Sequence, residues 1–138
     1  MHKALFIAAT LAFARVPSAA FADALVARIN VSTQTMTVGR VLHQWPVSTA
    51  RRGYVTPRGS WRPKRLSRMW YSSKYENSPM PYSVFYYGGY AIHGTGAVKQ
   101  LGRPASHGCV RLRIANAAAF YALVKEVGPS KTRIVVTK

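Results

Sequence analysis

A single cysteine stands in a short segment that also holds a histidine and a glycine. The segment reads Ser106-His107-Gly108-Cys109-Val110-Arg111-Leu112, and a second motif, His93-Gly94-Thr95, lies upstream. A thiol attacks a carbonyl carbon as the thiolate, and a nearby imidazole lowers the thiol pKa and can accept its proton. These residue types predict a cysteine nucleophile, Cys109, that is activated by a histidine.

One glycine follows His93 and another precedes Cys109, and each can help the neighbouring side chain or backbone to approach a substrate. His93 ends a predicted strand just before a glycine-rich loop, where a side chain can extend into a site. Gly94 lets the backbone approach closely, and Gly108 could free backbone N–H groups to face a developing oxyanion. The pattern therefore favours attack on a carbonyl group.

Two other interpretations remain open on the residue types alone. A metal site is disfavoured, because zinc prefers four ligands, often several cysteines, and this chain has one cysteine with no acid near it in sequence. A lone cysteine is also often a small buried apolar side chain. The sequence therefore predicts no metal and no cofactor, and a purely structural Cys109 is the alternative to a nucleophile.

The first 22 residues have the features of a secretory signal peptide. They begin with a short basic stretch, continue with an apolar run followed by Arg15, and end in the cleavage motif Ala20-Phe21-Ala22. The apolar run is too short to span a bilayer, and no later stretch is apolar enough to do so. We therefore expect a signal peptide over 1–22 and one domain over 23–138; a buried N-terminal helix is the alternative.

The chain is strongly basic. Its 138 residues carry a formal net charge of +17, with Asp23, Glu76 and Glu126 as the only acids. Such a charge attracts polyanions but says little about the fold. Nucleic acid would be the first candidate for a cytosolic protein, whereas anionic wall polymers or lipid head groups fit an exported one. Because the sequence indicates export, we expect no nucleic-acid partner; a basic surface without a specific partner is the alternative.

Alternation of apolar residues predicts strands along most of the chain. They are expected at 24–31, 34–38, 41–49, 60–66, 82–87, 90–93 and 132–137. Helical spacing of apolar residues from Ala117 to Val127, followed by Gly128-Pro129, predicts one helix. The polar segment 67–81 is expected to be an irregular loop that covers a binding site. The fold class is therefore mainly β with one C-terminal helix, a small β-sandwich or barrel-like domain.

The segment Ser-His-Gly-Cys-Val-Arg, preceded by Ile-His-Gly-Thr, resembles the L,D-transpeptidase catalytic domain, also called the YkuD domain. Val47-Ser48-Thr49 and Thr56-Pro57-Arg58-Gly59 resemble two further segments of that family, and the likeness covers residues 24–138. Ala50 departs from the glycine that is usual in the family. Arg113-Ile114 replaces the small or amide residues that usually open the helix, so its N-cap is not evident.

The resemblance implies a catalytic role for five residues. Cys109 would be the nucleophile that forms a thioester with a donor stem peptide. His93 would be its general base, oriented by the backbone carbonyl of Gly94 in the way that a carboxylate orients the histidine of other triads. His107 would assist near the oxyanion, and backbone N–H groups around Gly108 and Cys109 would form the oxyanion hole.

The resemblance also implies a substrate and a location. Arg111 and Ser106 are the expected substrate-binding residues, with a structural ion pair as the equal alternative for Arg111. The implied partners are peptidoglycan stem peptides and carbapenem-type inhibitors, in the periplasm or associated with the cell wall. The acyl group of a stem tetrapeptide would pass to an amine.

Three alternatives to this reaction remain. Water as the acceptor would make the protein a carboxypeptidase or an endopeptidase acting on the same bonds. A non-enzymatic basic module that binds the cell wall rests on charge alone. A sortase-like thiol peptidase also uses an arginine, but lacks the Ser-His-Gly-Cys motif.

The expected cleavage can be checked directly. We predict that export removes the residues up to Ala22, so N-terminal sequencing of the exported protein should begin at Asp23. An exported protein that still carries Met1 would contradict the prediction.

Overall fold

The computed structural model describes residues 23–39 and 43–138. The expected signal peptide, 1–22, lies outside the described residues. Within the described part of the chain, no helix is long and apolar enough to cross a membrane.

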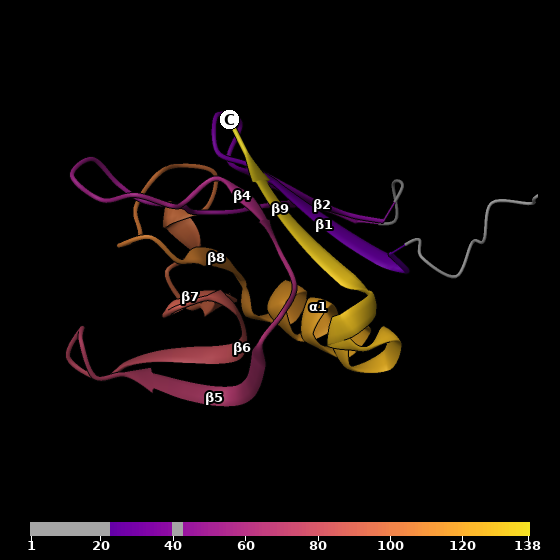
Figure 1. Cartoon of the computed structure of the whole chain (residues 1–138). Coiled ribbons are helices and arrows are strands. Elements are labelled where there is room, and N and C mark those ends of the chain that lie inside the picture. Colours follow the sequence, from indigo (N-terminus) through magenta and orange to yellow (C-terminus); the bar gives the residue numbers. More distant parts are fainter. Residues whose placement is uncertain (1–22, 40–42) are drawn as a thin grey trace, which may run out of the picture.

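In the described residues, nine strands form two sheets around one α-helix, α1 (Ile114–Val127) (Figure 1). The first sheet has the order β3-β2-β1-β9-β4 and contains β1 (Leu25–Asn30), β2 (Thr35–Val38), β3 (His43–Pro46), β4 (Gly59–Trp61) and β9 (Thr132–Thr137). The second has the order β5-β6-β7-β8 and contains β5 (Arg65–Ser72), β6 (Ser78–Tyr87), β7 (Tyr90–Thr95) and β8 (Val110–Arg113). Two short 3₁₀ helices, Val98–Gln100 and Pro129–Lys131, complete the described elements. The expected fold class, mainly β with one C-terminal helix, is confirmed.

The helix α1 packs mainly against β6 and β7 and also reaches β8 and β1 (Figure 1). Its inward residues, Ala117, Phe120 and Val124, are buried in the same apolar core as Val84 of β6. The N-cap residue of the helix, Arg113, makes no side-chain cap hydrogen bond, and the C-cap residue, Gly128, has a φ of 91°, in the left-handed region. Burial of one helical face against the sheet, rather than capping, therefore stabilises this helix.

Side chains alternate along the strands of the second sheet, so one face of this sheet lies toward the core and the other toward the candidate site. Ile92 pairs with Val110, and both are fully buried in the core beneath α1. The next residue of each strand, His93 or Arg111, points to the opposite face, because successive side chains of a strand alternate. On that face His93 pairs with Arg111. The same apolar alternation that anchors the helix therefore directs the chemical residues outward.

The segment 67–81 is not the irregular loop expected from the sequence; that expectation was wrong. It lies mostly in the antiparallel pair of β5 and β6, which runs from Arg65 opposite Phe85 to Ser72 opposite Ser78. The strand β5 is an edge strand with mostly exposed side chains, so it lacks the apolar alternation of a half-buried strand. The prolines of β6, Pro79 and Pro81, precede the part of β6 that pairs with β7. A missing N–H group costs little at these two positions, because only β5 pairs with β6 there.

Candidate active site

The parallel pairing of β7 and β8 brings the cysteine and a histidine together. His93 of β7 pairs with Arg111 of β8, and Cys109 precedes Arg111 by two residues, so the three side chains project from one face. The thiol-bearing residue also packs against a small apolar cluster of Met80, Phe85 and Ala91. Two residues that are 16 positions apart in the sequence thus become neighbours on one surface of the sheet.

His93 is held in one tautomer by a neutral partner. Its side chain is 6% exposed, and Nδ1 lies 2.7 Å from the backbone carbonyl oxygen of Gly94. A carbonyl oxygen only accepts, so Nδ1 carries the proton and Nε2 is left as the proton acceptor. Burial lowers the pKa of His93 to about 4, which outweighs the opposing effect of the Gly94 carbonyl. The imidazole is therefore neutral, and able to act as a base, at ordinary pH.

Gly94 must also be small. A Cβ at this position would lie 3.0 Å from Cα of Ile114 and 3.2 Å from Cγ of Pro81. The residue therefore allows the first turn of α1 to approach β7 closely, while its carbonyl orients His93.

Cys109 differs from the expectation that a nearby imidazole lowers its pKa. Its side chain is half-buried, and burial raises the pKa of the thiol, against smaller lowering effects from the Ala91 backbone and Arg111. Sγ lies 3.9 Å from the carbonyl oxygen of Gly89, a weak contact that suits an S–H donor. The resting site therefore favours a neutral thiol beside a neutral imidazole over a thiolate–imidazolium pair.

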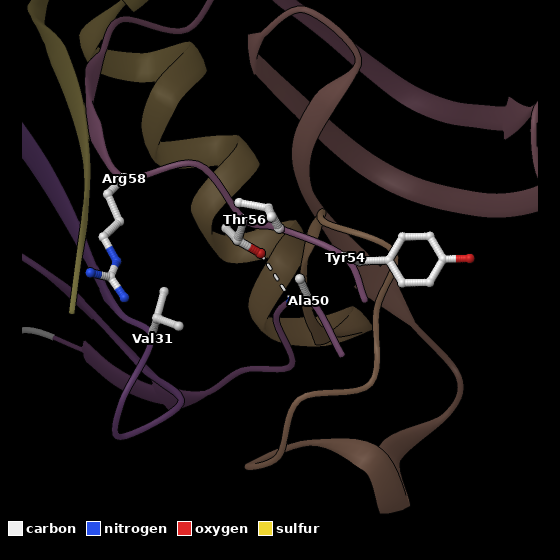
Figure 2. A pocket seen from close by; sticks show the side chains of 6 residues that line it. Val31, Ala50, Tyr54, Thr56 and Arg58 are labelled. Atoms are coloured by element: carbon white, nitrogen blue, oxygen red, sulfur yellow. Dashed lines mark hydrogen bonds between the residues drawn. The ribbon is translucent and has the colours of Figure 1, made fainter. Parts of the chain in front are cut away.

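The backbone before the cysteine is fixed by side-chain hydroxyl groups. Thr56 Oγ1 donates to the carbonyl oxygen of Gly108 at 2.9 Å and accepts from the N–H of Ala50 at 2.9 Å, the second of which Figure 2 shows. Ser106 Oγ accepts from the N–H of Gly108 at 3.0 Å and donates to the carbonyl oxygen of Cys109 at 2.6 Å. These four bonds define the path of the chain on both sides of the nucleophile.

These hydrogen bonds bear on two expectations about the segment. Ser106 was expected to bind substrate; it lines the larger cavity but is 1% exposed, and its hydroxyl group is engaged with the backbone of Gly108 and Cys109, so it also fixes the backbone beside the thiol. The N–H of Gly108 was expected to face an oxyanion, but it donates to Ser106. Gly108 also has a steric role, since its φ is 135° and a Cβ would lie 2.6 Å from Tyr90 Cε1 and 2.8 Å from the Val55 carbonyl oxygen.

His107 lies between two tyrosines that the sequence did not single out. Its ring stacks on Tyr75 at a centroid distance of 4.1 Å and an angle of 14°, and meets Tyr54 edge-on at 4.8 Å. Its pKa is lowered, first by desolvation and then by the charges of Arg51, Arg111 and Lys74. Tyr75 belongs to the turn between β5 and β6, so this turn reaches the segment that carries the nucleophile.

Arg111 contacts an amide and not an acid. Its Nη1 atom lies 3.3 Å from Oε1 of Gln100, and both salt bridges found in the described residues involve Asp23. The alternative of a structural ion pair for Arg111 therefore finds no support in the part of the chain that the structure describes. In that same part, no group of three or more His, Cys, Asp or Glu side chains lies close enough to hold a metal ion.

A cavity of about 800 Å³ opens over these residues. His93, His107, Cys109 and Arg111 all line it, together with the turn between β5 and β6 and the segment around Tyr54. A second cavity of about 480 Å³ shares Tyr54 and Val55 with it; Figure 2 shows Tyr54 pointing away from Arg58 of that second cavity. The larger cavity holds all the residues that can do chemistry, so it is the candidate active site.

The steric role of Gly108 can be tested by a matched pair of glycine variants. We predict that Gly108→Ala lowers the free energy of unfolding by about 2–4 kcal/mol, because it strains the backbone and clashes with Tyr90 and Val55. Alkylation of Cys109 should change as well, since the residue beside it must move. Gly96→Ala is the control, because a Cβ there meets nothing within 4 Å. Thermal unfolding and thiol alkylation measure both effects, and equal stability of the two variants would contradict the prediction.

The chain matches the family model of the L,D-transpeptidase catalytic domain, YkuD, over residues 25–136. Its fold is similar to an L,D-transpeptidase from Mycobacterium tuberculosis (26% identity, TM-score 0.74, 83% of this chain and 58% of that one) and to one from Xylanimonas cellulosilytica (28%, 0.68, 88% and 63%). A third similar structure is the L,D-transpeptidase LdtMt1 in complex with imipenem (27%, 0.73, 83% and 59%). The chain spans about six tenths of these proteins, and no curated protein matches it. With the matched region spanning both sheets and the cavity, this chain belongs to the L,D-transpeptidase catalytic domain family.

Proposed function

We propose that this protein is an exported peptidoglycan L,D-transpeptidase that acts through a thioester on Cys109. The supporting observation is that His93 lies on β7 and Cys109 lies immediately before the adjoining parallel strand β8, both at one cavity, with the His93 ring oriented by the Gly94 carbonyl. This is the arrangement of nucleophile, base and orienting acceptor that acyl transfer needs, with a backbone carbonyl in the third role.

The proposed reaction has two halves. Nε2 of His93 accepts the thiol proton as Sγ of Cys109 attacks the carbonyl carbon of the third residue of a stem tetrapeptide. The tetrahedral intermediate collapses with cleavage of the peptide bond, and His93 returns the proton to the departing D-amino acid. An acceptor amine then attacks the thioester, His93 takes its proton, and the thiol is regenerated as the new amide forms.

A neutral resting pair suits this route. Burial raises the thiol pKa of Cys109 and lowers the pKa of His93, so charge separation is unfavourable before substrate arrives. Proton transfer then accompanies the attack on the carbonyl group. The positive charges of Arg111 and other basic residues near the cavity would stabilise the negative charge that develops on the substrate oxygen.

His107 has a supporting role in this proposal. The tyrosines Tyr54 and Tyr75 hold its ring, so it is positioned beside the nucleophile independently of any substrate. With the N–H of Gly108 bonded to Ser106, the backbone N–H of Cys109 and the His107 ring are the proposed donors to the oxyanion. Arg111 is the proposed partner of a substrate carboxylate.

The acceptor and the location belong to the same proposal. Stem peptides of the cell wall are the proposed substrates, and the features of a signal peptide over 1–22 support a periplasmic or wall-associated location. Transfer to water instead of an amine would use the same residues. The imipenem complex of the relative LdtMt1 supports a carbapenem as a probe for Cys109.

Mass spectrometry of the purified 23–138 chain with a synthetic stem tetrapeptide tests the proposal. We predict loss of the terminal D-residue, a covalent acyl adduct on Cys109, and a new amide when an amine acceptor is added. Cys109→Ala should abolish all three products. A wall-binding module without activity would bind peptidoglycan equally well as wild type and as Cys109→Ala, and would form no adduct, which would contradict the proposal.

A pH profile of Cys109 acylation distinguishes the two histidines. Because the pKa of His93 is lowered to about 4, the neutral base is present above that pH, so wild-type acylation should rise through about pH 4 and then level off toward neutrality. His93→Ala should lose roughly two to four orders of magnitude and recover as the pH rises, when hydroxide replaces the base. His107→Ala should lose less. Normal acylation by His93→Ala, or a larger loss in His107→Ala, would assign the base to the other histidine.

A further inference from the structure

The guanidinium group of Arg65 is held in a corner of two aromatic rings. Its Cζ atom lies 4.3 Å from the ring centroid of Trp70 and 4.1 Å from that of Phe85. The two rings meet edge-on at 5.8 Å and 83°. Arginine stacks on aromatic faces through cation–π attraction and is weakly hydrated, so this contact limits the motion of an otherwise flexible side chain. All three residues line the cavity that contains Cys109.

The strand register places Arg65 in one row with the nucleophile. Arg65 pairs with Phe85, and Phe85 pairs with Ala91. Cys109 packs against the small apolar cluster to which Phe85 and Ala91 belong. Neighbouring strands are about 4.8 Å apart, so the Phe85 position, over which the guanidinium lies, is about 10 Å from the Cys109 position. An extended peptide advances about 3.3 Å per residue. The guanidinium group is therefore about three residues of extended peptide away from the thiol.

The wall of the cavity is positively charged. The arginine and lysine residues that line it are Arg65, Lys74 and Arg111, and no acidic side chain of the described residues lines it. Arg111 contacts Gln100, whereas the salt bridges of the described residues both involve Asp23. The five N–H donors of Arg65 thus face a cavity whose described lining holds no carboxylate to neutralise them. A planar guanidinium group of this kind matches a carboxylate with two parallel hydrogen bonds.

We propose that Arg65 determines donor specificity by binding a free carboxylate of the donor peptide. This inference rests on the proposed function, in which the leaving side of the donor is a single residue. The cavity wall between Cys109 and Arg65 is about as long as three residues of extended peptide. It therefore accommodates the acyl part of the donor and not the single leaving residue. The enzyme selects acidic donor peptides in which a residue upstream of the attacked carbonyl carries a free carboxylate, and it discriminates against the corresponding carboxamide.

Two synthetic tetrapeptide donors test this specificity. They are identical except that the first residue, the third from the thiol when the attacked residue is counted as one, carries a free side-chain carboxylate in one and a carboxamide in the other. The value of kcat/KM is measured from release of the terminal residue. For wild type we expect the carboxylate donor to be favoured roughly tenfold, the lower range for a hydrogen-bonded charge pair, because Arg65 is exposed. The preference should shrink at high salt.

Variants of Arg65 separate recognition from packing. Arg65→Gln should lower kcat/KM for the carboxylate donor to about that of the carboxamide donor and leave the carboxamide donor unchanged. Arg65→Lys should keep part of the preference, because lysine retains the charge but not the planar fork. Arg28→Gln removes an exposed charge from β1 in the other sheet and should change neither donor. Loss of the packing of residue 65 on Trp70 and Phe85 would lower kcat/KM for both donors. The carboxamide donor is therefore the internal control for such a loss.

Equal kcat/KM of the two donors with wild type would overturn the inference. A loss of the same size on both donors in Arg65→Gln would do so as well, since it would show a structural role only. These outcomes differ from failure of the proposed function. If neither donor forms an adduct on Cys109, the proposed transpeptidase activity is itself wrong and the specificity falls with it.

Discussion

The parallel alignment of β7 and β8 is the constraint on which both the core and the site depend. One face of this pair carries Ile92 and Val110, fully buried beneath α1, and the other carries His93 opposite Arg111. Because side chains alternate along a strand, a slip of one residue would expose the core positions and bury the polar ones. The apolar packing of α1 therefore fixes the relative position of the base and the nucleophile. Stability and chemistry in this domain rest on the same strand register.

The candidate site contains no carboxylate among its described residues, and this has an electrostatic consequence. An acid beside a buried histidine would raise its pKa, whereas the neutral carbonyl of Gly94 orients the ring and leaves burial to lower the pKa to about 4. Burial acts on the Cys109 thiol in the opposite direction and raises its pKa. Both effects favour the uncharged forms. In the proposed reaction, charge therefore appears only when the substrate carbonyl is attacked, beside a cavity wall that is basic.

The sequence predicted those features that depend on local patterns. Apolar alternation and helical spacing indicated most strands and α1. The residue types around Cys109 predicted a thiol site, and His93, expected at the end of a strand, lies two residues before the end of β7. The sequence did not predict features that depend on contacts between residues far apart in the chain or on exposed strands. The exposed edge strand β5 has no apolar alternation, so the β5–β6 pair was mistaken for a loop. Nothing local showed that Ser106 would bind the backbone of Gly108, or that Tyr75 would stack on His107.

In the proposed reaction, chemistry and recognition come from different parts of the second sheet. His93 lies on β7 and Cys109 lies just before β8, next to the core, whereas the β5–β6 pair supplies Arg65, Trp70 and Tyr75 from the sheet edge. An edge strand has one hydrogen-bonded neighbour and exposed side chains, so its residues can change at little cost in stability. Substitution there would alter the charge and shape of the cavity without shifting the register of β7 and β8. Donor preference in this fold can therefore vary while the thiol and its base stay fixed.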